Sequence, residues 1–200
     1  MILSKKLDRF VGALALAGVG VAAQSASAAV VFVPNANINI PSTFAGVYLN
    51  VVTGANATAP AGAPGWDVNP WNSTSFSLFS PTAPAGGAYV NVGGNSNLAP
   101  NAPIGPGSTF AAGAGGTSAW SLGNSNNLVG FRFQNEANGN QIHYGWMRVA
   151  LSSTLQGQPR TIVEYAYEST AGVAIGAGVP TPGAASLLGL AGLAGLRRRR

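Results

Sequence analysis

Residues that could perform acid–base chemistry are few and widely spaced. Residues 29–178 contain one histidine, His143, and four carboxylates, Asp67, Glu136, Glu164 and Glu168. Histidine is the usual general base near neutral pH, but no partner motif accompanies His143, which we expect to be a packed strand residue. The chain has no cysteine, so a zinc site would lack ligands. We therefore predict no catalytic residue, no metal and no cofactor, and a protein that is not an enzyme.

A carboxylate pair is the remaining route to catalysis, because two such groups can hydrolyse a glycosidic bond. Glu164 and Glu168 would face the same side of one strand, but about 13 Å of strand would separate them, beyond the ~5 to 9.5 Å of glycosidase pairs. A polysaccharide hydrolase would therefore need Asp67 or Glu136 to fold in from loops. We keep this activity as a third hypothesis.

The sequence supports a binding role better than a catalytic one, through the stretch WDVNPW at residues 66–71. Carbohydrate recognition needs a flat aromatic face for sugar CH groups and amides or carboxylates for hydroxyls. Trp66 and Trp71 with Asp67 and Asn69 supply both in one short loop. The same tryptophans could instead close the end of a β-sandwich. A Ca²⁺ site here would have only one carboxylate, which is a small share of the six to eight oxygen ligands that the ion takes.

Strands and turns must position these residues, since no segment shows sustained helical spacing of apolar residues. The alternation predicts an all-β fold, an antiparallel β-sandwich or jelly-roll-like single domain with long Gly/Asn/Pro loops. The longest loops are expected at 54–65 and 93–117. The predicted strands span residues 30–33, 37–40, 45–53, 74–79, 88–92, 128–134, 141–151 and 161–168.

The clearest local pattern is a hairpin in residues 127–151. Val129, Phe131 and Phe133 alternate with smaller or polar residues, and Asn138-Gly139 favours a turn because both residues tolerate positive φ. The second arm is apolar on both faces over part of its length, which predicts a central strand. Its two faces carry Ile142, Tyr144 and Trp146 on one side and His143, Gly145, Met147 and Val149 on the other.

The last predicted strand, residues 161–168, reads TIVEYAYE. Strict alternation places Val163, Tyr165 and Tyr167 on one face. The opposite face would carry Ile162, Glu164 and Ala166.

Charge is concentrated at the two ends of the chain. The formal net charge is +5, but Lys5, Lys6 and Arg9 lie in the leader and four arginines end the chain. Three arginines against one aspartate and three glutamates leave residues 29–178 with a net charge of −1. Nucleic-acid binding needs many Lys or Arg on one face, so nucleic acid is excluded as a partner.

Residues 1–28 match a cleaved signal peptide. Basic residues precede an uncharged apolar run at 11–23, and Ala26-Ser27-Ala28 offers the small residues that signal peptidase accepts. We predict cleavage after Ala28, and residues 29–178 as the extracellular domain. The alternative is an uncleaved anchor, for which the run is shorter than the ~20 apolar residues of a membrane span.

Residues 179–200 end in a short apolar segment and a basic cluster. The uncharged run at 184–196 would reach about 20 Å as a helix, short of the ~30 Å hydrocarbon core. Pro180 and Pro182 keep a helix from extending backwards. The arginines would stay on the cytoplasmic side, leaving the preceding domain outside.

This tail resembles the PEP-CTERM sorting signal of Gram-negative bacteria. The matching residues are Val179, Pro180, Thr181, Pro182 and Gly183, the apolar run, and Arg197, Arg198, Arg199 and Arg200. The usual middle residue is Glu, and Thr181 departs from it. The resemblance implies signal peptidase and an exosortase-type transpeptidase as partners, transient retention at the inner membrane, and a final place at the cell surface or in the exopolysaccharide matrix. An ordinary tail anchor or an amphipathic membrane-surface segment is the alternative.

The domain also resembles a recurrent β domain of secreted PEP-CTERM proteins, through its GFRF, HYGW and YAYE segments. That resemblance implies a common fold and no activity. We therefore expect a secreted, non-enzymatic protein of the cell surface or extracellular matrix with a structural or adhesive role, and exopolysaccharide as a possible partner. A lectin-like carbohydrate-binding module is the alternative.

Overall fold

The computed structural model describes residues 29–179, which form an all-β domain as predicted. The predicted signal-peptidase residues Ala26 and Ala28 and the sorting residues from Pro180 onward lie outside the described residues. Two short 3₁₀ turns, η1 (Pro60–Gly62) and η2 (Glu136–Asn138), interrupt the strands. Within residues 29–179, no helix has the length and apolar character needed to cross a membrane.

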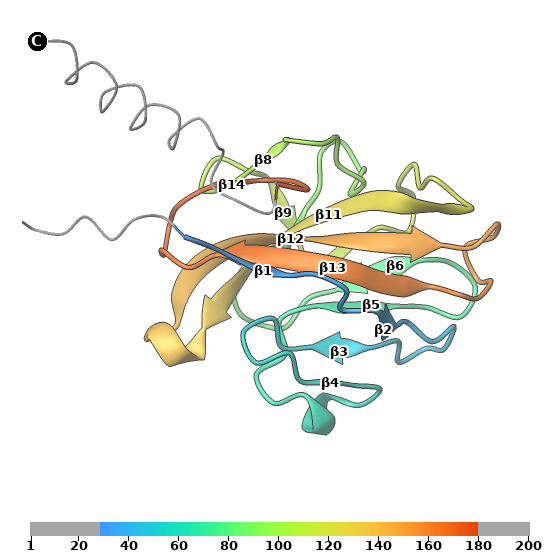
Figure 1. Ribbon diagram of the computed structural model, residues 1–200, viewed down its shortest axis with the longest axis horizontal. Helices are drawn as coiled ribbons and strands as arrows, with labels where there is room; N and C mark the ends of the chain where they lie inside the picture. The colour runs from blue at the N-terminus through green and yellow to red at the C-terminus, as the bar shows by residue number, and fades with distance from the viewer. Residues whose placement is uncertain (1–28, 180–200) are drawn as a thin grey trace, which may run out of the picture.

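One seven-stranded antiparallel sheet dominates the domain, in the order β1-β13-β12-β11-β7-β9 with β2 also paired to β13 (Figure 1). Its strands are β1 (Val30–Val33), β2 (Ile38–Asn39), β7 (Tyr89–Val90), β9 (Phe110–Ala111), β11 (Asn124–Asn135), β12 (Gln141–Leu151) and β13 (Thr161–Glu168).

Three smaller antiparallel sheets complete the described fold. They join β10 (Gly113–Ala114), β6 (Ser77–Phe79) and β5 (Asn69–Trp71); β14 (Ile175–Gly176) and β8 (Pro103–Ile104); and β3 (Tyr48–Leu49) and β4 (Asn56–Ala57). In Figure 1, β8 and β14 lie along the upper side of the long strands and β3 and β4 along the lower side.

The hairpin of β11 and β12 forms where it was predicted. The strands pair from Asn135↔Gln141 back to Asn124↔Leu151, and residues 136–140 make the turn. Gly139 (φ 62°) and Asn140 (φ 58°) adopt the left-handed conformation, while the Asn135 side chain accepts a 3.0 Å bond from Ala137 N. The turn is therefore longer than a two-residue type I′ turn, and glycine provides the reversal.

Apolar side chains cover both faces of the central strand β12, as the sequence predicted. Met147 and Val149 enter the larger core, which lies between the main sheet and the β5/β6 layer. Tyr144 and Trp146 enter a second core, which includes Ile104 of β8. A strand buried on both faces fixes its register firmly, because a one-residue slip would exchange the two cores.

The predicted faces of β13 are wrong at its beginning. Arg148 pairs with Glu164, but the next residue, Val149, pairs with Ile162, so the ladder skips Val163. This bulge turns Ile162 into the same core as Tyr165 and Tyr167, rather than to the opposite face. Strict alternation could not reveal it, since a bulge is set by pairing with the neighbouring strand.

Two predicted segments also differ from the structure. The strand expected at 45–53 is reduced to Tyr48–Leu49, because Asn50 Oδ1 accepts bonds from Val52 N (3.0 Å) and Thr53 N (2.9 Å) and turns the chain. The loop expected at 93–117 contains the three short strands β8, β9 and β10.

Arg160 joins the beginning of β13 to the N-terminal half of the domain. Its guanidinium is fully buried and donates only to backbone carbonyls. The acceptors are Ile40 O (3.3 Å), Pro41 O (2.6 Å), Asn72 O (3.0 Å), Ser75 O (2.9 Å) and Leu155 O (3.1 Å). One side chain thus satisfies carbonyls from several loops that have no strand partner there.

Candidate functional site

An aromatic groove of about 410 Å³ opens beside β3, β5 and β6. We call it the aromatic groove; its lining residues are Phe44, Ala45, Tyr48, Asn69, Trp71 and Phe79. Four of these six side chains are aromatic. Such a surface suits a ligand with flat apolar faces.

The rings of the groove are exposed and hold one another in place. Phe44 is 80% exposed and Phe79 is 49% exposed, although both are large apolar side chains. Phe44 meets Trp71 edge-to-face, with ring centroids 4.9 Å apart. Trp66 lies behind the groove, where it meets Tyr48 edge-to-face at 4.9 Å and stacks on Phe79 at 6.1 Å. These contacts fix the direction of each ring without burying it.

Gly46 allows the segment that carries Phe44 to lie against β5. Its φ is +62°, and an added Cβ would collide with the Pro70 carbonyl and the Trp71 backbone. Only glycine accommodates this close approach. The Asn69 amide then ties the segment down by donating 2.9 Å bonds to both Ala45 O and Val47 O. Asn69 therefore acts as a positioning residue for the groove.

The buried phenol of Tyr89 supports the groove from the core. Its hydroxyl accepts a 2.7 Å bond from Asn69 N and donates a 3.1 Å bond to Phe79 O. It thereby fixes the relative positions of β5 and β6. Burial raises the pKa of Tyr89 above its ordinary value, although the bond from Asn69 N acts in the opposite direction. The hydroxyl stays protonated and can keep donating to Phe79.

The indole nitrogen of Trp71 has no hydrogen-bond partner among residues 29–179, although the atom is buried. Buried donors are nearly always paired, because an unpaired donor costs about 1–3 kcal/mol. The groove wall therefore holds a polar group whose bonding capacity the described chain does not use. A hydroxyl or a water would satisfy it.

A second hollow, of about 230 Å³, lies next to the groove and contains two carboxyl groups, those of Asp67 and Glu136. Trp66 lines this hollow as well. Asp67 is only 3% exposed, and its Oδ2 accepts a 2.8 Å bond from Val51 N. Burial raises the pKa of Asp67 to about 8, aided by the nearby charge of Glu136 and opposed by the bond from Val51. We call this hollow the carboxylate cleft.

Burial keeps Asp67 protonated near neutral pH, and Glu136 beside it is exposed. A buried, protonated carboxyl beside a second carboxyl group is an arrangement that acid–base catalysts use. Glu136 lies in the turn between β11 and β12, far from Asp67 in sequence. The structure thus brings these two carboxyl groups together from loops.

The remaining titratable groups have structural partners. His143 is buried, with Nδ1 2.8 Å from Glu168 O and Nε2 3.2 Å from Asn138 Nδ2. Because a carbonyl only accepts, Nδ1 of His143 is the donor to Glu168 O. This is the packed strand histidine that the sequence predicted. Within residues 29–179, no group of three or more His, Cys, Asp or Glu side chains could hold a metal ion.

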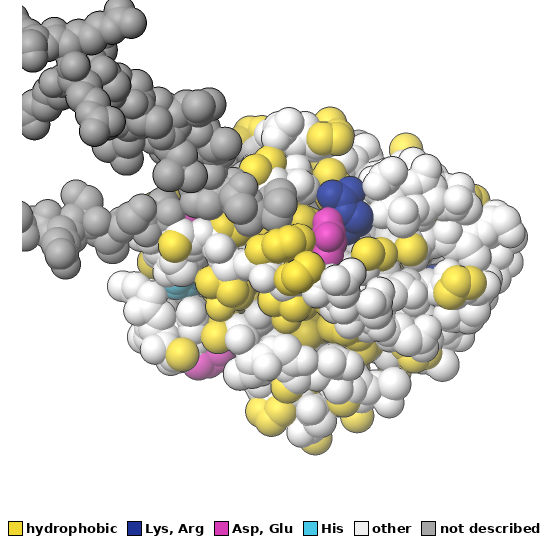
Figure 2. Space-filling view, viewed as in Figure 1, with side chains coloured by type: hydrophobic (Ala, Val, Ile, Leu, Met, Phe, Trp, Pro, Cys, Tyr) yellow, Lys and Arg dark blue, Asp and Glu magenta, His cyan; other side chains and the backbone are white. Residues whose placement is uncertain are grey.

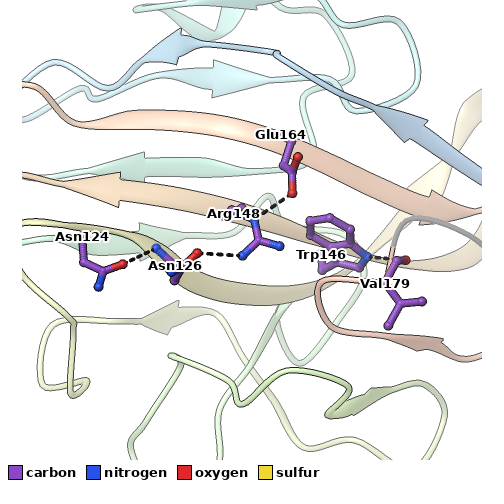
Figure 3. A network of polar contacts seen from close by, with 6 residues as sticks. All are labelled: Asn124, Asn126, Trp146, Arg148, Glu164 and Val179. Atoms are coloured by element: carbon purple, nitrogen blue, oxygen red, sulfur yellow. Dashed lines mark hydrogen bonds and ion pairs between the residues drawn. The ribbon is translucent and has the colours of Figure 1, made fainter.

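Glu164 forms an ion pair with Arg148, whose Nε lies 2.7 Å from Glu164 Oε1 (Figure 3). Arg148 also donates to Asn126 Oδ1 at 3.2 Å. Figure 2 shows basic (blue) and acidic (magenta) atoms side by side on an otherwise mostly uncharged face.

The four residues predicted to contact carbohydrate separate into two kinds. Trp71 and Asn69 line the groove, while Trp66 and Asp67 line the carboxylate cleft. Both tryptophans are half-buried, so they pack the end of the β5/β6 layer and still face a hollow. The side chains of Asp67 and Asn69 form hydrogen bonds to backbone groups, and these bonds stabilise the loops that carry the aromatic residues.

Sequence reasoning missed three of the groove aromatics, Phe44, Tyr48 and Phe79. Phe44 follows Pro41-Ser42-Thr43 and precedes Ala45-Gly46, and an aromatic residue inside such a turn was the available signal. Tyr48 and Phe79 carried no local sign of their place in the groove, because they belong to separate strands.

Comparison with known proteins places the chain in no family: no family model, curated protein or solved structure matches it.

Proposed function

We propose that this chain is an exported protein of the cell surface or extracellular matrix with a structural and adhesive role, and that it holds polysaccharide in the aromatic groove. The observation that carries the proposal is the exposure of two neighbouring aromatic rings in one groove, Phe44 at 80% and Phe79 at 49%. Soluble domains rarely expose such rings together unless the surface binds something.

Carbohydrate fits this surface better than other ligand classes. Pyranose rings present apolar CH faces that stack on aromatic side chains, and their hydroxyls need hydrogen-bond partners at the edges. Tyr48 and Asn69 provide polar atoms beside the rings. The groove contains no charged side chain, so an uncharged polymer segment would not leave a buried charge unpaired.

Polysaccharide binding is tested with a glycan array and a polysaccharide pull-down on the exported protein. Phe44→Ala should weaken binding at least about tenfold, because stacking on one ring contributes roughly 1.4 kcal/mol or more. Leu122→Ala is the matched control, since Leu122 is an exposed apolar residue (45%) that does not line the groove. Equal binding by both variants, or no binding by the wild type, would leave only the structural role.

Processing is the second part of the proposal. Signal peptidase would remove residues 1–28, and an exosortase-type transpeptidase would act at Pro180-Thr181-Pro182-Gly183 after transient retention at the inner membrane. Support comes from the two signals in the sequence. Intact-mass analysis of the cell-surface form tests it. A mature protein that still ends in Arg200 contradicts sorting.

Hydrolysis of polysaccharide is a second candidate, which one observation favours. Asp67 and Glu136 share a cleft beside the aromatic groove, with the pKa of Asp67 raised to about 8. A polysaccharide bound in the groove would therefore lie beside a cleft that contains two carboxyl groups. Release of reducing ends that Glu136→Gln abolishes would establish this activity. Binding without release would leave the adhesive role alone.

A further inference from the structure

Glu168 presents a buried carboxylate to the first described residue of the chain. It lies at the end of β13 and is only 3% exposed. Its Oε1 accepts a 2.9 Å bond from Ala29 N and a 2.9 Å bond from Thr170 N. Both donors are backbone amides, so the carboxylate has hydrogen bonds but no cation in these contacts.

No side-chain cation of residues 29–179 is available to Glu168. The segment has no lysine, and its three arginines are engaged elsewhere. Arg132 donates to Ala85 O and Gly87 O, Arg148 pairs with Glu164, and Arg160 donates to carbonyls. The His143 ring contacts the Glu168 carbonyl rather than its carboxylate. A buried carboxylate without a positive partner is costly.

Ala29 is held on both sides of its α-carbon. Besides the bond from its nitrogen to Glu168, its carbonyl accepts a 2.9 Å bond from Ser169 N. The next residue, Val30, already pairs with Glu168 in the β1–β13 ladder. The nitrogen of Ala29 therefore keeps a fixed position 2.9 Å from a carboxylate oxygen.

We infer that Glu168 is a built-in binding site for the α-ammonium group of the mature N-terminus at Ala29. This rests on the proposed processing, in which water adds across the Ala28–Ala29 peptide bond. That hydrolysis leaves a carboxylate on Ala28 and an ammonium group on Ala29. The neutral amide donor next to Glu168 thus becomes a cation in the same place, and the buried charge gains its partner.

The ion pair would fasten β1 to the edge of the main sheet. β1 has four residues and pairs only with β13. Phe32 of β1 packs on Trp146, with centroids 6.1 Å apart, and Trp146 Nε1 donates to Val179 O at 3.2 Å (Figure 3). Trp146 therefore contacts both ends of the described chain. Cleavage would stabilise the part of the domain from which both ends emerge.

The chain offers a single-site test. Its only lysines are Lys5 and Lys6, so a protein cut after Ala28 has one primary amine, the α-amine of Ala29. The exported protein is purified, its first residue is determined by N-terminal sequencing, and its rate of labelling by an amine-reactive ester is measured near neutral pH. Only the unprotonated amine reacts, and a carboxylate partner makes that form rarer.

We expect Ala29 as the first residue and labelling about tenfold slower in the wild type than in Glu168→Gln, which corresponds to about one pH unit in the protonation of the amine. Gln keeps an oxygen that can accept both amide bonds and removes only the charge. Glu164→Gln, on the same strand but paired with Arg148, is the matched control and should label as slowly as the wild type. Glu168→Asp, which keeps the charge but shortens its reach, serves if the Gln variant does not fold.

The outcomes separate this inference from the function proposed above. A first residue other than Ala29 contradicts the processing and the inference with it. Ala29 as the first residue, with equal labelling in the wild type and both Glu168 variants, overturns the ion pair alone. Polysaccharide binding in the groove is measured independently of either result.

Discussion

The two halves of the domain hold their backbones in different ways. Strands β11, β12 and β13 have 12, 11 and 8 residues and pair along most of their length. Between residues 34 and 87 no strand exceeds three residues. In this half, side-chain amides bond backbone carbonyls that have no strand partner. Asn50 donates to Pro64 O and Gly65 O, and Asn69 donates to Ala45 O and Val47 O.

This difference divides the domain into a half that supports the fold and a half that carries the candidate binding surface. The long strands form a regular sheet with a core on each face, while the short-stranded half carries the aromatic groove. Loops fixed by amide side chains can expose aromatic rings without losing their backbone hydrogen bonds. We therefore expect substitutions in the linking and buried positions to affect stability, and substitutions on the groove surface to affect binding.

The largest effect should come from Arg160→Met. It leaves buried carbonyls without donors at the junction of the two halves, and we expect a loss of about 3–5 kcal/mol in the free energy of unfolding. Urea denaturation measures it. The control is Arg132→Met, because Arg132 is half-exposed and donates to only two carbonyls, Ala85 O and Gly87 O. Similar losses in both variants would show that Arg160 does not join the halves.

The second-largest loss of stability should come from Gly145→Ala, in the long-stranded half. An added Cβ would lie 2.7 Å from the Ala166 carbonyl oxygen and 2.7 Å from the Phe131 ring. Overpacking of this kind costs about 1–3 kcal/mol. Gly113→Ala on β10 is the control, since a Cβ there meets nothing within 4 Å. Thermal unfolding of both variants gives the comparison, and an unchanged Gly145→Ala protein would contradict the close packing of β12.

Asp67→Asn should change how stability depends on pH. Because the folded pKa of Asp67, about 8, exceeds its ordinary value of 3.8, the folded state holds the proton more firmly. Wild-type stability is then full below about pH 4 and is progressively lost as pH rises to about 8. The Asn variant should lack this fall. Urea midpoints at several pH values test it, and parallel curves would contradict the raised pKa.

The smallest effect on stability should come from Phe44→Ala. An exposed ring contributes little to folding, so the free energy of unfolding should change by less than about 0.5 kcal/mol. Its loss of polysaccharide binding would then reflect the groove surface rather than unfolding. A large loss of stability would instead assign Phe44 to the scaffold.

Sequence patterns predicted the long-stranded half well. β12 and β13 have the bounds that alternation indicated, and Gly139 of the predicted turn has a positive φ, although the second residue with positive φ is Asn140 rather than Asn138. The exception is Ile162, which the bulge in β13 turns to the larger core. In the other half, the strand predicted at 45–53 was too long, because the Asn50 side chain accepts hydrogen bonds from Val52 N and Thr53 N and turns the chain.

By itself, the sequence determined the all-β class, the central strand of the sheet and the near absence of charge in the domain. These follow from local alternation, from turn residues and from counting, which need no knowledge of distant contacts. Only the tertiary structure decided that Phe44 and Phe79 share a groove, that Asp67 meets Glu136, and that Glu168 faces Ala29. Each of these pairs joins residues far apart in the chain, and their proximity depends on how the sheets pack and how buried polar groups find partners.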